Sequence, residues 1–107
     1  MFLLPTREKA DAFNRVMTEQ GCGAVSWHEN TWHYYERWEH LLEGKTVTRS
    51  GYPFRSENGD VRCDYRAPAL PKTGELLSRC LTIPVNIYME EQIPRILSAI
   101  NKAARVI

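Results

Sequence analysis

The stretch Leu81-Thr82-Ile83-Pro84-Val85-Asn86-Ile87 decides the fold class, because it is the clearest strand pattern in the sequence. Apolar side chains at every second position alternate with polar residues or proline, which is typical of a half-buried strand. Pro84 has no N–H group to donate to a neighbouring strand. We therefore expect residues 81–87 to form a strand at the edge of a sheet, or a strand with a bulge at Pro84.

Two amphipathic helices are predicted, one near each end of the chain. The first begins after Thr6, a suitable N-cap, and ends at Gly21, which can adopt a left-handed conformation. The last starts near Glu90 and tolerates Pro94 because this proline lies early in the helix. The predicted buried faces contain Ala10, Phe13, Val16 and Met17 in the first helix and Ile93, Ile96, Leu97, Ile100 and Ala104 in the last.

Shorter elements are expected between these helices. Residues 2–4 and 23–27 are predicted strands, and aromatic residues at helical spacing from Trp32 predict a helix that ends at Gly44. Thr73 is expected to cap another short helix. The sequence therefore predicts one domain, residues 1–107, of the α+β class. Its small antiparallel sheet has three to four strands, with helices packed mainly on one face.

Residues 45–70 are expected to form a long excursion without regular periodicity. Asn58-Gly59 is its predicted turn, and at most one short strand is expected, near residues 62–65. A long excursion in a small domain usually covers a functional surface or rests on a partner.

Composition excludes several classes of protein. The 107 residues are 43% hydrophobic and 25% charged, which is ordinary for a folded chain. Fourteen basic against thirteen acidic residues give a net charge of +1, so neither nucleic acid nor a membrane is an expected partner. The three cysteines form no C-x-x-C pair, and no apolar run is long enough for a membrane span or a signal segment. We expect a cytoplasmic location.

The densest chemistry lies between Trp27 and His40, which enclose all the tryptophans and histidines of the chain. Aromatic rings with polar tips make good ligand walls, and a strand-to-helix junction offers unpaired backbone N–H groups. The predicted substrate-binding residues are Trp27, His28, Asn30, Trp32, His33 and Tyr34. Their side chains are expected to project partly into solvent or a shallow cleft, with Asn30 or Thr31 capping the junction. Two alternatives are that these aromatics are simply core, and that His28, His33 and His40 bind a metal. The histidine gaps of five and seven residues do not place two ligands on one helical turn.

Three segments together resemble a known family. They are LLPT at residues 3–6 with the helix that follows, WHENTWHYYERWEHL at residues 27–41, and LPKTGELLSRCLTIPV at residues 70–85. They resemble the carboxy-terminal small domain of the DegT/DnrJ/EryC1/StrS aminotransferases. Those are fold-type-I enzymes that use pyridoxal phosphate to aminate keto-sugars, usually nucleotide-linked. The resemblance covers nearly the whole chain and is most specific in residues 70–85.

The resemblance implies a small domain that supports a dimer, supplies a substrate wall and is not catalytic by itself. The family's Schiff-base lysine and cofactor contacts belong to its large domain, and none of Lys9, Lys45, Lys72 and Lys102 has a matching context. No cofactor is therefore expected in this chain alone, and pyridoxal phosphate is expected in a full-length parent. The implied partners are the large domain or a homodimer partner, together with a keto-sugar substrate.

Two interpretations of the chain's origin follow from this resemblance. The chain is expected to be either an excised small domain or a free-standing, truncated remnant. The alternative function is a stand-alone module that binds a small molecule or a protein. A metal-dependent enzyme built on the three histidines is a third hypothesis.

Overall fold

The computed structural model describes residues 1–62, 64–65 and 70–107. The chain forms two compact units. The first joins Met1–His28 to Glu75–Ile107, and the second is Glu29–Gly74.

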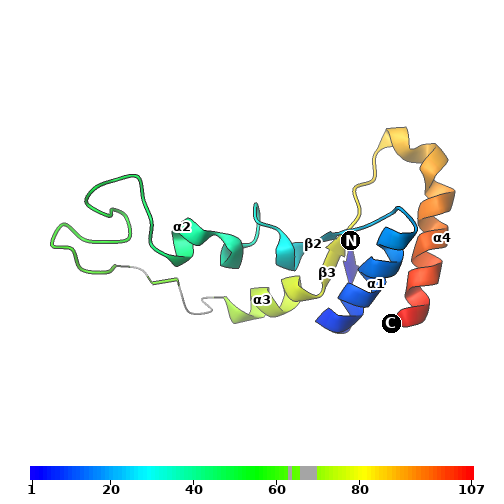
Figure 1. Cartoon of the computed structure of the whole chain (residues 1–107), viewed down its shortest axis with the longest axis horizontal. Helices are drawn as coiled ribbons and strands as arrows, with labels where there is room; N and C mark the ends of the chain where they lie inside the picture. The colour runs from blue at the N-terminus through cyan, green and yellow to red at the C-terminus, as the bar shows by residue number, and fades with distance from the viewer. Residues whose placement is uncertain (63, 66–69) are drawn as a thin grey trace. The chain divides into compact units, whose positions relative to one another are not determined.

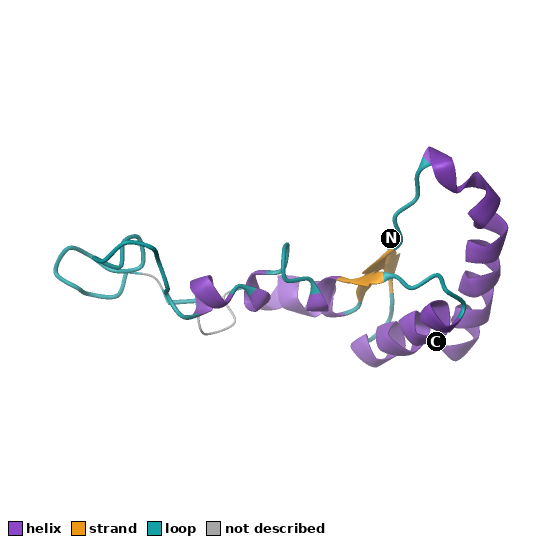
Figure 2. Cartoon of the chain, turned by 45° about the horizontal axis from the view of Figure 1, so that its top comes forward, coloured by secondary structure: helices purple, strands orange, loops and turns teal. Residues whose placement is uncertain are grey.

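The first unit contains a three-stranded antiparallel sheet (Figures 1 and 2). Its strands are β1 (Phe2–Leu3), β2 (Val25–Ser26) and β3 (Cys80–Thr82), in the order β1-β3-β2. In the register, Leu81 lies opposite Phe2 on one side and Ser26 on the other. The prediction of an α+β fold with a small antiparallel sheet and helices packed against it is confirmed.

The position of β3 differs from the expectation in two ways. This strand is central rather than at an edge, and it ends at Thr82 instead of continuing to Ile87. In a central strand every backbone N–H group faces one of the two neighbouring strands. Proline has no N–H group to donate, so the ladder stops before Pro84. Val85 and Ile87, predicted to share the buried face of this strand, are 67% and 85% exposed.

Helix α1 (Arg7–Glu19) begins as predicted. The Thr6 hydroxyl oxygen accepts a hydrogen bond from the backbone N–H of Lys9 at 3.3 Å. The hydrogen bond of Glu8 with the Thr6 side chain also holds the pKa of the Glu8 carboxyl below its ordinary value. Gly21 follows the helix with a φ of +69°, the left-handed conformation that glycine adopts without strain. The N-cap at Thr6 and the end of the helix at Gly21, both predicted from the sequence, are therefore confirmed.

Helix α4 (Ile93–Ala103) follows a 3-10 helix, Ile87–Gln92, and continues into another, Ala104–Val106. Pro94 lies in its first turn, as predicted. Its buried residues are Ile96, Ala99 and Ala103. The predicted burial of Ile93, Leu97 and Ala104 is wrong, since all three are exposed. Small alanines let two helices approach closely, so the face that carries Ala99 and Ala103 packs against α1.

The core of the first unit lies between α1, α4 and β3. The rings of Phe2 and Phe13 lie with their centroids 5.3 Å apart. The buried cluster consists of Leu4, Ala10, Phe13, Met17, Cys22, Leu81, Ile96, Ala99 and Ala103. This unit therefore has a hydrophobic core of its own.

The second unit is built from short helical pieces. Where one helix was expected up to Gly44, there are a 3-10 helix, Tyr35–Arg37, and the four-residue α2 (Glu39–Leu42). The continuous helix is wrong because Trp38 adopts φ −92° and ψ 89°, outside helical geometry, between the two pieces. Gly44 does end α2, with a φ of +61°.

Helix α3 (Pro71–Ser78) begins two residues before Thr73. Thr73 therefore lies inside the helix, and its predicted role as N-cap is wrong. Proline suits a first helical position because the N–H group that it lacks would have no helical partner there.

The excursion over residues 45–70 contains a small hairpin-like loop. Arg55 and Val61 form an isolated β-bridge, and the N–H of Arg62 donates to the carbonyl of Phe54 at 2.8 Å. The predicted Asn58-Gly59 turn closes this loop, with a φ of +84° at Gly59. The predicted strand near residues 62–65 includes Cys63, which lies outside the described residues; the residues described there form no strand. No helix in the described part of the chain is long and apolar enough to cross a membrane.

Candidate functional site

The six predicted site residues are divided between the two units. Trp27 and His28 lie in the 3-10 helix Trp27–Glu29, directly after β2, and both are half-buried. Asn30, Trp32, His33 and Tyr34 lie in the unit Glu29–Gly74.

The side chain of Asn30 stabilises the turn that contains Trp32 and His33. Its side-chain oxygen accepts hydrogen bonds from the backbone N–H groups of Trp32 and His33, both at 2.9 Å. Nδ1 of His33 lies 3.2 Å from the same oxygen, and the N–H of Tyr34 donates to the Asn30 carbonyl at 3.1 Å. Asn30 caps as predicted, but it caps a turn rather than a helix. One ring nitrogen of His33, Nδ1, is therefore engaged by Asn30.

The turn holds two side chains outward and one inward. Trp32 is 83% exposed and His33 is exposed, as expected for residues that offer a surface to a ligand. Tyr34 is 1% exposed, so the expectation that its side chain projects toward solvent is wrong. In a helix or strand, the spacing of apolar residues predicts which side chains are buried. An irregular segment has no such repeat, so the sequence could not show that Tyr34 is buried while Trp32 is exposed.

Sequence reasoning missed the polar network around Tyr34. The Tyr34 and Tyr35 hydroxyls both donate to the Glu36 carboxylate, the second at 3.0 Å to Oε1, and the Tyr35 hydroxyl accepts from the N–H of Leu70 at 3.0 Å. A Cβ on Gly74 would lie 3.1 Å from Glu36 Oε1 and 3.2 Å from the Tyr34 hydroxyl. Gly74, a glycine inside the predicted short helix, was the one sequence feature that pointed to this network, since a glycine within a helix often marks close packing.

Burial, with the adjacent Glu36 carboxylate, raises the pKa of the Tyr34 hydroxyl well above its ordinary value. An unfolded tyrosine loses its proton near pH 10. The folded unit keeps that proton, so the stabilisation is fully present below about pH 10 and decreases as the pH rises further.

We expect Tyr34 to be the last tyrosine to ionise and the unit Glu29–Gly74 to lose stability above about pH 10. Tyrosinate absorbance and hydrogen exchange, followed against pH, measure these two effects. In Tyr34→Phe the late ionisation should be missing, and stability should depend less steeply on alkaline pH. An identical ionisation profile in both proteins would show that Tyr34 is not the late group.

The described residues assemble neither a metal site nor a pyridoxal-phosphate site. No group of three metal-binding side chains gathers within the described ranges. A Schiff-base lysine needs an unprotonated amine in a pocket. The Lys45 ammonium instead bonds to Glu43, which raises its pKa, and Lys102 Nζ donates to Gln20 Oε1 at 2.6 Å. Lys72 is exposed, and Lys9 lies half-buried on α1. These lysines do not fit the cofactor.

The first unit has a cleft that the sequence did not reveal. Its volume is about 150 Å³, and its lining includes Ile83, Met89, Ile96 and Arg95. Nη2 of Arg95 donates to the carbonyl of Gly21 at 3.2 Å, which holds the guanidinium beside the cleft. The cleft offers a small apolar space next to one cation.

Comparison of the chain with protein-family models, with curated proteins and with solved structures finds no match. The family resemblance of residues 27–41 and 70–85 therefore stays a prediction.

Proposed function

We propose that the chain acts as the non-catalytic small domain of a pyridoxal-phosphate-dependent aminotransferase that aminates keto-sugars, and that it supplies one wall of the substrate site. The observation that carries this proposal is the exposure of Trp32, at 83%, on a turn whose geometry Asn30 fixes. A large aromatic side chain held in solvent by an ordered turn adds nothing to a core. Its ring face suits the apolar C–H face of a sugar.

The lack of a core in the second unit supports a partner for this domain. Tyr34 is the only buried side chain among the described residues of Glu29–Gly74. A segment of this size normally needs more burial, or another stabilising contact, to remain folded. The large cofactor-binding domain is the partner that the resemblance implies, and a homodimer partner is the alternative.

The proposed role of this chain is binding and orientation. Trp32 would pack against the sugar ring, and the exposed imidazole of His33 would hydrogen-bond to sugar hydroxyls while Asn30 fixes its position. The buried Tyr34 side chain would stabilise the turn through its hydrogen bond to Glu36. Trp27 and His28, which directly precede this segment in the sequence, remain predicted substrate-binding residues. Cofactor chemistry belongs to the large domain, because the lysines of this chain do not fit it.

The proposal predicts that the purified chain forms no internal aldimine. Mixed with pyridoxal phosphate and reduced with borohydride, it should show only weak, unselective labelling of its four lysines by peptide mass spectrometry. A saturable adduct on one lysine would contradict the non-catalytic assignment. The complementary assay uses the large domain of an aminotransferase of this family, prepared without its own small domain.

We expect the added chain to restore amination of a nucleotide-linked keto-sugar by that large domain. The enzyme's own small domain, supplied separately, is the positive control. Trp32→Ala should lower the restored activity mainly through a higher KM, whereas Tyr88→Ala, at a side chain that is 87% exposed in the other unit, should not. Restoration by the positive control alone would refute the proposal.

The cleft beside Arg95 favours a second candidate function, a module that binds a small molecule. Its apolar lining and adjacent guanidinium suit a short aliphatic carboxylate. This candidate differs from the first because it needs neither the large domain nor Trp32.

A further inference from the structure

Asn58 and Gly59 close a small hairpin over residues 54–62 (green in Figure 1). The N–H of Gly59 donates to the carbonyl of Ser56 at 2.9 Å, and the N–H of Ser56 donates to the carbonyl of Asp60 at 2.8 Å. With a φ of +84° at Gly59, these two bonds are typical of a three-residue loop, a type I turn followed by a glycine bulge. The length of the main chain in this loop is therefore fixed.

An asparagine that precedes glycine is chemically labile. The backbone nitrogen of the glycine gives up its proton and attacks the side-chain carbonyl carbon of the asparagine, and glycine has no side chain to obstruct this attack. A C–N bond forms, and the side-chain amide nitrogen leaves with that proton as ammonia. Water then opens the resulting succinimide ring at either carbonyl, which gives aspartate or isoaspartate. The reaction consumes one water, releases one ammonia and needs no enzyme or oxidant.

Asn58 is the asparagine of this chain most open to that reaction. Asn58 and Gly59 are both exposed, and a Cβ added to Gly59 would meet nothing within 4 Å beyond its neighbours along the chain. Within the described ranges, the Asn58 side chain has no hydrogen-bond partner. Only Asn58, among the five asparagines of the sequence, precedes a glycine. The others precede Arg15, Thr31, Ile87 and Lys102.

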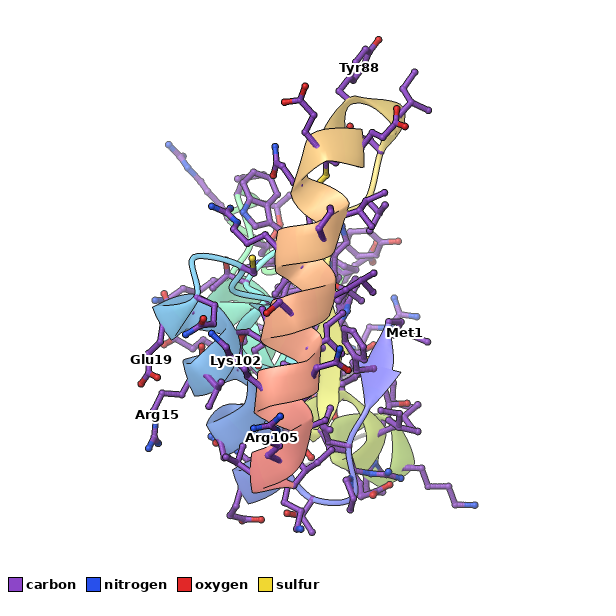
Figure 3. The ribbon with its side chains drawn as sticks, turned by 90° about the vertical axis from the view of Figure 1, so that its right-hand side faces the viewer. Met1, Arg15, Glu19, Tyr88, Lys102 and Arg105 are labelled. Atoms are coloured by element: carbon purple, nitrogen blue, oxygen red, sulfur yellow. The ribbon has the colours of Figure 1, made fainter. Side chains whose placement is uncertain are left out.

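The fold holds the other four asparagines in place. The side chain of Asn14 forms two hydrogen bonds with backbone groups, and the side-chain oxygens of Asn30 and Asn86 accept backbone N–H groups. Asn101 lies in α4 directly before Lys102, which Figure 3 shows on the carboxy-terminal half of that helix. The N–H of Lys102 is bonded within the helix, so its nitrogen is not free to attack.

We propose that Asn58 is a site of spontaneous deamidation and that the hairpin sets the rate of this reaction. While the turn is closed, the Gly59 N–H is bonded to the Ser56 carbonyl, so the nitrogen cannot attack Asn58. Nη1 of Arg55 donates to the Gly59 carbonyl at 3.1 Å and stabilises the closed turn. The reaction therefore proceeds from molecules in which the hairpin has opened locally.

The isoaspartate product would keep the hairpin open. Its main chain runs through the former side chain and is one carbon longer, so it no longer fits the three-residue loop. Its carboxylate adds a third negative charge beside Glu57 and Asp60. We expect the bond from the N–H of Arg62 to the carbonyl of Phe54 to be lost. The proposal is independent of the proposed function, because it needs neither a partner nor a sugar.

Peptide mapping by mass spectrometry, during incubation of the full chain at mildly alkaline pH, tests the site and its protection. We expect deamidation at Asn58 before any other asparagine, at least about fivefold more slowly in the folded chain than in the chain unfolded in guanidinium chloride. Arg55→Ala should raise the rate in the folded chain at least about twofold, because the closed turn loses a hydrogen bond. Arg49→Ala, the same change at an exposed arginine of the same unit, should leave the rate unchanged.

Three outcomes would overturn the proposal. They are earlier deamidation at another asparagine, an Asn58 that stays intact in the folded chain, and equal rates in the Arg55→Ala and Arg49→Ala variants. Circular dichroism confirms that both variants are folded.

Hydrogen exchange of the incubated chain tests the effect of the product on the hairpin. Methylation by an isoaspartate methyltransferase measures the isoaspartate fraction. In that fraction the N–H of Arg62 should exchange about as fast as in an unfolded chain, whereas the N–H of Cys22, bonded to the Met17 carbonyl in the first unit, should stay slow. Asn58→Asp is the matched control, because it adds the charge without lengthening the main chain, and it should keep the Arg62 N–H protected. Slow exchange of Arg62 in the isoaspartate form would show that the modification leaves the hairpin closed.

Discussion

Replacing Leu81 with alanine is expected to lower the free energy of unfolding of the first unit by about 3–5 kcal/mol. Leu81 is 1% exposed in the central strand and belongs to the cluster between α1, α4 and the sheet. Truncation removes its apolar contacts and leaves a cavity that the paired strands on both sides prevent from collapsing. Urea unfolding, followed by circular dichroism, measures the change.

The matched control is Leu76→Ala on α3. Leu76 is 44% exposed, and alanine is at least as good a helix former as leucine, so we expect a loss below about 1 kcal/mol. The pair compares the same chemical change at a buried and at an exposed leucine. Equal losses at both positions would mean that β3 does not lie in the core.

Replacing Tyr34 with alanine is expected to open the unit Glu29–Gly74 while the first unit stays folded. Removal of a buried aromatic side chain typically costs about 3–5 kcal/mol. Here it also removes a hydrogen-bond donor from Glu36 and the only buried side chain among the described residues of the unit. We expect the backbone N–H groups of Tyr34 and Leu70, which are bonded in the native unit, to exchange about as fast as in an unfolded chain.

Tyr52→Ala is the control within the same unit. Its side chain is 59% exposed, so its loss should leave the exchange of Tyr34 and Leu70 unchanged. Exchange in α1 should stay slow in both variants, because α1 packs in the separate core of the first unit. If Tyr34→Ala leaves exchange in Glu29–Gly74 slow, Tyr34 does not hold that unit together.

The candidate site was predicted from the sequence only in part. Clustered aromatics and histidines drew attention to residues 27–34, and Asn30 was a recognisable capping residue. The inward side chain of Tyr34 was not predictable, because it depends on Glu36 and on the close approach of Gly74, forty residues further along the chain. A contact between distant segments leaves no periodic signal in either of them.

The sequence by itself determined the elements whose causes are local. Thr6 caps α1 through a hydrogen bond from the backbone N–H of Lys9. Gly21 and Gly44 end their helices with positive φ. The alternation of apolar residues that begins at Leu81 predicts a strand there. Only the tertiary structure decided which apolar residues of α4 are buried. Ile93 and Leu97 are more hydrophobic than Ala99, yet they lie exposed, because close helix packing selects small side chains over large ones at the contact with α1. The tertiary structure also decided that β3 is the central strand, because β1 and β2, which lie far from it in the sequence, pair with its two sides.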